Sequence, residues 1–392
     1  MTSEAAVTSS VIPLSVPEIR GNEWTYIKEC LDTGWVSSIG PFVARFEREL
    51  AAAVKAPHAV ALVNGTAALH IALKLIGVQP EEEVLVSDFT FIAPVNAIRY
   101  CQAHPVFVDA DLRSWQMDVE KLGRFLSREC EMKEGVCTNK RTGRRVRAVL
   151  PVHILGLACE MDRIVELARR FGLGVVEDAA EGIGVRYQGR PVGTFGDVGV
   201  FSFNGNKVVT AGGGGMIVTH SESLAEKARY LTTQAKDDEL EYIHNEVGYN
   251  YRLTNLQAAL GVAQLEQLDS FLVRKRAIAQ VYAEALRDLK GITLMPSPKE
   301  TQPTWWLYTF LLREGTPLKE RKKILHQLQE AGIGARPLWH PIHSLPPYRD
   351  CQGVELEVSD RLYERGISLP SSVGLEQRDL NRCIAAVRQV VG

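Results

Sequence analysis

The sequence lacks the features that would place the protein in a membrane, on a nucleic acid or in a disulfide-bonded scaffold. Its 392 residues include seven cysteines, an odd number without any C-x-x-C pair, which argues against a disulfide framework and a structural zinc site. Basic residues (45) and acidic residues (47) nearly cancel, so no nucleic-acid surface is indicated. No apolar run reaches the length of a membrane span, and the first residues lack a signal-peptide pattern. We therefore expect a cytoplasmic protein without a membrane or nucleic-acid partner.

Short apolar runs alternate with helical patterns between about residue 59 and residue 218. This alternation predicts βαβ units and an α/β fold around a mostly parallel sheet. An amphipathic helix is expected over residues 161–171, closed by Gly172. The predicted strands are residues 59–63, 83–86, 105–108, 148–152 and 174–177.

A second unit is expected towards the C-terminus. Residues 254–257 (Thr-Asn-Leu-Gln) have the form of a capping box and open a long helical stretch that runs towards Leu289. The pattern then predicts a strand over residues 305–312 and helices over residues 318–331 and 376–391. We place the domain boundary inside the long helix, which gives a large domain of residues 12–265 and a smaller C-terminal α+β domain of residues 266–392.

The segment Asn64-Gly65-Thr66-Ala67-Ala68-Leu69-His70 is a candidate phosphate site. A strand ends before it, the glycine permits a tight turn, and a helix begins with Thr66 in its first turn. The unpaired N–H groups and the dipole of a helix N-terminus favour an anion. An ordinary βα turn with a threonine cap is the alternative for this segment taken alone.

An acidic segment, Glu177-Asp178-Ala179-Ala180-Glu181, follows another predicted strand. Ligands of open α/β sheets bind outside the carboxyl ends of such strands. Asp178 could cap a helix, or it could pair with a protonated pyridine nitrogen and make that ring an electron sink.

Lys207 ends the segment Phe201-Ser202-Phe203-Asn204-Gly205-Asn206-Lys207 and precedes four glycines, Gly212 to Gly215. The order required of a nucleotide-binding P-loop, G-x-x-x-x-G-K-[ST], is not met. The glycines are better explained by a backbone that packs close to a ligand or a partner. Burial of a lysine generally lowers its pKa and favours the uncharged, nucleophilic amine. Lys207 is therefore a candidate for a Schiff base with a carbonyl cofactor.

A phosphate cradle, an acid and a lysine, in this order, are the pattern of fold-type I enzymes that use pyridoxal 5′-phosphate (PLP). With these motifs and Gly248-Tyr249-Asn250-Tyr251-Arg252-Leu253, the chain resembles the DegT/DnrJ/EryC1/StrS family of sugar aminotransferases from about Ile12 onwards. The resemblance implies a fold-type I PLP transferase that acts on a nucleotide-linked keto-sugar with L-glutamate as the amino donor.

The resemblance also implies roles for individual residues. Lys207 would bond to the cofactor and move the substrate proton, and Asp178 would pair with the pyridine nitrogen. The other residues expected at the cofactor are Gly65, Thr66 and Ser202 at the phosphate, Phe91 on the ring, and Glu181 near the ring hydroxyl. Asn250 and Arg252 would reach the phosphate of a second subunit in a homodimer with shared sites, unless they only support the following helix. Arg336 and His343 would lie near the sugar. His340 and His343 could suggest a metal, but no third ligand has suitable spacing, so no metal is expected.

Finer features resemble the LegC-type branch of the family. They are Ile12-Pro13-Leu14-Ser15-Val16-Pro17, Gly34-Trp35-Val36-Ser37-Ser38, the insert of residues 139–147 and the all-glycine run. This branch implies amination at C4 of a UDP- or GDP-linked 4-keto-6-deoxy sugar. The expected substrates are 2-acetamido sugars of the legionaminic acid or bacillosamine type. A PLP-dependent dehydratase or lyase, another aminotransferase, and a non-catalytic regulatory homologue are the alternatives. Because family members that dehydrate carry histidine in place of the lysine, Lys207 favours transamination.

Overall fold

The large unit of the protein is built on one eight-stranded sheet. The computed structural model describes residues 11–238 and 240–392 of the chain. In spatial order the sheet consists of β1 (His58–Leu62), β11 (Gly215–Thr219), β10 (Val198–Ser202), β7 (Gly174–Asp178), β6 (Val146–Leu150), β2 (Glu83–Ser87), β3 (His104–Val108) and β18 (Gly353–Val354). Strands from β10 to β18 pair in parallel, whereas β11 pairs antiparallel with β1 and β10. The expected α/β fold with a mostly parallel sheet is confirmed.

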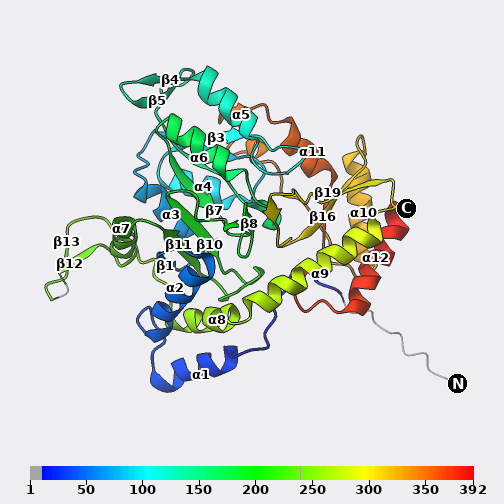
Figure 1. The fold of residues 1–392 in the computed structure, drawn as a ribbon, viewed down its shortest axis with the longest axis horizontal. Helices are drawn as coiled ribbons and strands as arrows, with labels where there is room; N and C mark the ends of the chain where they lie inside the picture. Colours follow the sequence, from blue (N-terminus) through cyan, green and yellow to red (C-terminus); the bar gives the residue numbers. More distant parts are fainter. Residues whose placement is uncertain (1–10, 239) are drawn as a thin grey trace.

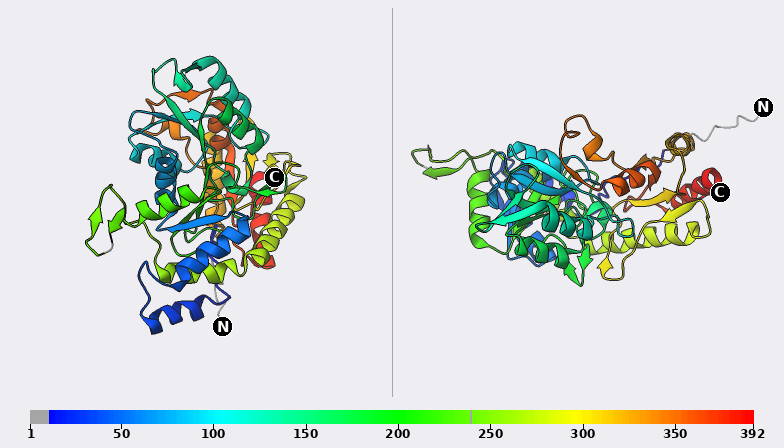
Figure 2. Two further views of the ribbon diagram at one scale, coloured as in Figure 1. Left: turned by 60° about the vertical axis from the view of Figure 1, so that its left-hand side comes forward. Right: turned by 90° about the horizontal axis from the view of Figure 1, so that it is seen from above.

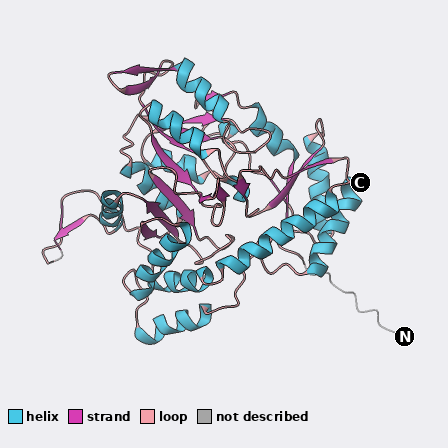
Figure 3. Ribbon diagram, in the orientation of Figure 1, coloured by secondary structure: helices cyan, strands magenta, loops and turns pink. Residues whose placement is uncertain are grey.

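Helices cover both faces of this sheet (Figures 1 and 3). The central one, α3 (Gly65–Leu75), is apolar almost all round and has eight buried residues, as expected of a helix enclosed between a sheet and other helices. By contrast α6 (Met161–Arg170) buries only one side, through Met161, Ile164 and Ala168. The other helices of the large unit are α1 (Glu23–Thr33), α2 (Pro41–Val54), α4 (Ala93–Tyr100), α5 (Val119–Arg124) and α7 (Glu222–Thr232).

The long C-terminal helical stretch is two helices rather than one. Thr254 caps α8 (Asn255–Leu265) by accepting the N–H of Gln257, and α9 (Leu268–Leu286) begins after a break at residues 266–267. We propose this break, between residues 265 and 266, as the boundary of the two domains. Beyond it lies a four-stranded sheet of β14 (Ile292–Leu294), β16 (Tyr308–Leu312), β19 (Gly366–Leu369) and β17 (Arg336–Pro337), with helices α10 (Leu318–Glu330), α11 (Glu357–Arg365) and α12 (Gln377–Val391).

The two units are joined by segments that cross between them. Near the N-terminus, Ile12 bridges to Ile333 and the carbonyl of Leu14 accepts the N–H of Ser371, so this segment lies on the C-terminal unit. In the other direction, β18 leaves the C-terminal unit and adds an edge strand beside β3. The C-terminal unit is therefore held against the large one at several places along the chain.

A hairpin of β12 (Lys236–Asp238) and β13 (Ile243–His244) projects from the body of the molecule (Figures 1 and 2). Its side chains include the exposed Tyr242 and Ile243, and the exposed Val247 follows it.

Among the described residues no helix has both the length and the apolar character needed to cross a membrane. The smaller strands are β4 (Cys130–Lys133), β5 (Val136–Asn139), β8 (Arg186–Tyr187), β9 (Arg190–Pro191) and β15 (Thr301–Gln302).

Candidate functional site

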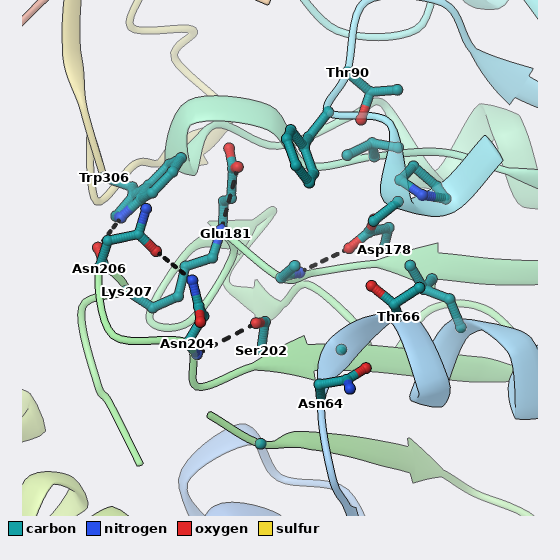
Figure 4. Close-up of a pocket in the computed structure, with 18 of the residues that line it drawn as sticks. Asn64, Thr66, Thr90, Asp178, Glu181, Ser202, Asn204, Asn206, Lys207 and Trp306 are labelled. Carbon is teal, nitrogen blue, oxygen red and sulfur yellow. Dashed lines mark hydrogen bonds and ion pairs between the residues drawn. The ribbon is translucent and has the colours of Figure 1, made fainter. Parts of the chain in front are cut away.

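A cavity of about 360 Å³ lies outside the carboxyl ends of β7 and β10 (Figure 4). The N-terminus of α3 opens into it, and Trp306 and Trp339 of the C-terminal unit form part of its wall. This is the position at which open parallel sheets bind their ligands. The cavity brings together residues that the sequence analysis found in three separate motifs.

The first motif forms one end of the cavity. Asn64 caps α3, its side-chain oxygen accepting the N–H of Ala67 at 2.8 Å. The first N–H groups of a helix have no partner inside the helix, so those of Gly65 and Thr66 are available to an anion. A Cβ on Gly65 would lie 3.0 Å from Cβ of Ser202, so glycine here lets the end of β10 approach the turn. Asn64, Gly65, Thr66 and Ser202 make a cradle suited to a phosphate.

Two glycines of the run after Lys207, Gly214 and Gly215, lie against this same cradle. Gly214 has a left-handed φ of 110° and bridges to Asn64. A Cβ on Gly215 would lie 2.5 Å from the carbonyl carbon of Asn64, so only glycine permits this approach. The expected close backbone packing is present, and the neighbour that requires it is the cradle turn.

Asp178 stands at the end of β7 and faces the cavity. Its Oδ1 accepts the N–H of Ala180 at 3.0 Å, and the side chain is 3% exposed. Burial raises the pKa of this carboxyl, an effect that the N–H of Ala180 and the charge of Lys207 oppose. A buried carboxylate at this place would favour a cationic ligand atom, which would repay the loss of hydration.

The residue before it, Glu177, is fully enclosed and fixes the surroundings of Asp178. Its carboxylate accepts backbone N–H groups of Gly193, Phe195 and Gly196 and the Nε2–H of His153 at 3.0 Å. The backbone N–H of Cys159 donates to Nδ1 of the same ring, which sets the histidine tautomer. This network holds the end of β7 and the loop before β10 in one arrangement.

Lys207 lies in the loop between β10 and β11, with its amine inside the cavity. The Nζ atom donates to Oε1 of Glu181 at 3.3 Å and lies 3.9 Å from the centroid of the Trp306 ring. The Trp306 indole N–H donates in turn to the carbonyl of Asn206 at 2.8 Å. The amine is thus held between a carboxylate and an aromatic face (Figure 4).

Aromatic side chains line the remaining wall. Phe91 lines the cavity and is 54% exposed, so it is not a core residue. Trp306 and Trp339 stack with a ring separation of 6.3 Å and an interplanar angle of 13°. Sequence reasoning missed these two tryptophans, together with Thr90, Asn204 and Asn206. Four of the five lie within or beside segments singled out for other residues.

Asn250 and Arg252 do not line the cavity of their own chain. The guanidinium of Arg252 donates to Glu47 at 3.0 Å and to the carbonyl of Ala61 at 3.1 Å. Asn250 is exposed and bridges to Thr233 through its backbone. Arg252 therefore supports β1, the strand that leads to the α3 cradle, and Asn250 faces outwards.

Arg336 and His343 also lie apart from the lining residues, although Trp339 between them is one of these. The Arg336 side chain is exposed, and its Nη1 donates to the carbonyl of Ala335 at 3.4 Å. Nδ1 of His343 donates to the buried Asp88 at 2.7 Å, and Asp360 lies 3.6 Å from its Nε2. The hydrogen bond with Asp88 raises the pKa of His343. In this arrangement His343 ties the loop carrying Trp339 to the end of β2.

Known proteins resemble the chain over nearly its whole length. The profile of the DegT/DnrJ/EryC1/StrS aminotransferase family matches residues 17–388. A GDP-perosamine synthase of Caulobacter vibrioides is 40% identical over 97% of this chain and 98% of its own. A GDP-perosamine synthase of Escherichia coli O157:H7 is 38% identical over 94% and 95%. A crystal structure of a DegT/DnrJ/EryC1/StrS aminotransferase from Brucella abortus superimposes with a TM-score of 0.86 at 30% identity, covering 95% of each chain.

The similarity to this family covers both the large unit and the C-terminal unit. It therefore includes the cavity walls that both units form. Aminotransferases of this family use PLP. The chain belongs to the DegT/DnrJ/EryC1/StrS aminotransferase family and is a PLP-dependent enzyme of the nucleotide-sugar aminotransferase type.

Proposed function

We propose that the enzyme transfers an amino group from L-glutamate to C4 of a GDP-linked 4-keto-6-deoxy sugar, in the biosynthesis of a surface glycan. The observation that carries the reaction type is the single cavity that contains the α3 cradle, Asp178 and Lys207. The carrier and the position of amination are supported by relatives named GDP-perosamine synthase, which match the chain at 38–40% identity.

The residues in the cavity fit PLP. The α3 N-terminus and Ser202 would receive the phosphate, since a Cβ on Gly65 would fill part of that space. Asp178, buried and facing the cavity, would hold the protonated ring nitrogen, and Lys207 would bond to the cofactor covalently. Phe91 would cover one face of the ring, and Glu181 would lie near the ring hydroxyl. When bound, the cofactor supplies a conjugated ring that accepts the electron pair left when a substrate C–H bond breaks.

The chain's own groups would do the remaining work. Lys207 would take the proton from the substrate carbon and deliver it to the cofactor side. The negative charge of Asp178 would keep the ring nitrogen protonated throughout. The tryptophan wall of Trp306 and Trp339 would exclude water from the lysine amine.

A panel of nucleotide sugars tests this proposal. Purified enzyme loaded with PLP is offered L-glutamate and the GDP- or UDP-linked 4-keto-6-deoxy sugar, with and without a 2-acetamido group, and the product is located by NMR. We expect the highest kcat/KM on the GDP-linked sugar lacking an acetamido group, with nitrogen at C4. A preference for UDP-linked 2-acetamido sugars would instead support the LegC-type resemblance, and nitrogen at C3 would refute the position.

We also propose a homodimer in which the Gly248–Leu253 segment of one subunit reaches the cavity of the other. Support comes from the exposed Phe91 at the cavity and from the exposed apolar side chains of the projecting hairpin, Tyr242 and Ile243. Because Arg252 is engaged with Glu47, the exposed Asn250 is the better residue to test.

Complementation between two variants checks this arrangement. Lys207→Ala and Asn250→Ala dimers would each be damaged at both sites, whereas a mixed dimer would have one intact site. Refolding the two together should restore activity when Asn250→Ala is itself impaired. Proven subunit exchange without recovery would rule out a contact across the interface.

A further inference from the structure

The amine of Lys207 has a carboxyl partner, which the proposed function places near the ring hydroxyl without giving it a part in proton transfer. Glu181 approaches Nζ of Lys207 to 3.3 Å, and its side chain is only 7% exposed. Its second oxygen, Oε2, accepts the N–H of Leu155 at 2.7 Å. Leu155 is held in the left-handed region with φ of 59°. The glutamate is thus fixed at one oxygen and presents the other to the lysine.

The charged groups around Glu181 make its protonation depend on Lys207. Burial raises the pKa of the Glu181 carboxyl, and the charge of Asp178 acts in the same direction. The cation of Lys207 and the N–H of Leu155 oppose both effects. The Trp306 ring, which contacts Nζ from the C-terminal unit, brings no titratable group. When the lysine gives up its charge, the influence that most favours the carboxylate disappears.

From this geometry we infer that Glu181 is the proton partner of Lys207: it takes a proton from the lysine ammonium and returns it when the lysine is freed. The transfer goes from Nζ of Lys207 to Oε1 of Glu181. An ammonium and a carboxylate become an amine and a carboxylic acid, so the pair keeps its net charge and needs no further reactant. The inference rests on the proposed function, since it names the group that holds the ammonium proton while the amine takes part in that reaction.

The hydrogen-bond geometry suits this exchange. A neutral carboxylic acid can still accept from Leu155 with one oxygen and donate from the other, so the anchor survives protonation. An amide at this position could keep the Leu155 contact but could not accept a proton. Glu181→Gln therefore removes the exchange while preserving the shape of the site.

The first test measures Lys207 itself, in the full chain without cofactor. The protein is labelled briefly with acetic anhydride between pH 6 and pH 10, and modification of Lys207 is quantified by mass spectrometry. Glutamine removes the carboxylate that pairs with Nζ of Lys207, so we expect Glu181→Gln to label about tenfold faster at neutral pH. Glu166→Gln, an exposed glutamate of α6, serves as the matched control and should label like the wild type.

The second test measures turnover of the PLP-loaded enzyme on L-glutamate and the GDP-linked keto-sugar. Loss of a proton partner should lower kcat about 100-fold in Glu181→Gln, with a changed pH profile and an unchanged KM for the sugar. Glu181→Asp keeps the charge at a greater distance, so its kcat should lie between those of the wild type and Glu181→Gln. This variant replaces Glu181→Gln in the test if the glutamine variant does not fold.

The outcomes separate this inference from the proposed function. Faster labelling together with lower kcat supports it. Unchanged labelling, or faster labelling with wild-type kcat, overturns it, while an inactive Lys207→Ala would leave the proposed function intact. A Lys207→Ala variant that turns over normally would instead overturn the proposed function.

Discussion

The buried amine of Lys275 makes the stability of the protein depend on pH in a predictable direction. This side chain of α9 is 3% exposed and donates to the carbonyls of Trp306 at 2.6 Å and Ser371 at 2.5 Å. Within the described residues no carboxylate pairs with it. A neutral amine has the two N–H groups that the two carbonyls require. An ammonium has a third N–H without an acceptor, and its charge is costly to bury. Burial accordingly lowers the pKa of Lys275 to about 7.

The sign and size of the effect follow from linkage. A lysine in the unfolded chain has a pKa of about 10.4, so its pKa is depressed by folding. Its contribution to stability is complete above about pH 10.4 and is lost as pH falls through that value towards the folded pKa. From pH 9 down to pH 7 the free energy of unfolding should fall by about 2 kcal/mol, and below about pH 6 it should change little further on this account.

Lys275→Met, which keeps the length and removes the titration, tests this reasoning. The variant leaves two carbonyls without donors, at a cost of roughly 1–3 kcal/mol each that does not vary with pH. Urea denaturation of the chain without cofactor, at half-unit steps from pH 6 to pH 9, gives the difference between wild type and variant. We expect the advantage of the wild type to grow with pH, whereas Lys322→Met, at an exposed position on α10, should show no such slope. A difference that is flat or shrinks with pH would contradict a lowered pKa of Lys275.

Three further predictions concern the site and its supports. Lys207→Ala should abolish turnover and the visible absorbance of bound cofactor, because the proposed covalent link would be lost; absorbance after dialysis and initial rates measure both. Asp178→Asn should bind cofactor but lose about 3 kcal/mol of transition-state stabilisation, on the order of 100-fold in kcat. Near-normal rates would show that Asp178 only caps the following turn. His343→Gln keeps a donor to Asp88 without a charge. The raised pKa of His343 means that its extra stability is full below about pH 6.5 and lost as pH rises through the folded value, so the Tm difference from wild type should be largest near pH 6 and smaller at pH 8.5.

The motifs around Asn64, Asp178 and Lys207 could be found in the sequence because their signals are local. Each follows a strand of recognisable pattern, and a parallel sheet brings the carboxyl ends of its strands to one edge. The tryptophan wall could not be found this way, because the Trp306 ring meets the Lys207 amine through the packing of one unit on the other. Residues 305–312 were predicted as a strand, and the strand begins only at Tyr308, which frees Trp306 to enter the cavity.

Long-range contacts also explain the other differences. The break between α8 and α9 has neither proline nor glycine to signal it. Glu266, at the break, bonds to Tyr26 and Arg45, partners that lie more than 200 residues away in the chain. The resemblance suggested a sugar contact for His343, and only the fold reveals Asp88 as the partner of its ring.

The N-terminal pairing has a consequence for how the protein is made. Ile12 leaves the ribosome early, but its partner Ile333 is synthesised about 320 residues later, roughly 20–60 s at ordinary elongation rates. Until then the hydrogen bonds of this segment are unmade, and the edge of β3 that receives Gly353 stays open. The nascent chain therefore cannot complete its cavity when the large sheet folds, because Trp306 and Trp339 of the cavity wall are synthesised later. The complete cavity around Lys207 should appear only after Trp339 has left the ribosome.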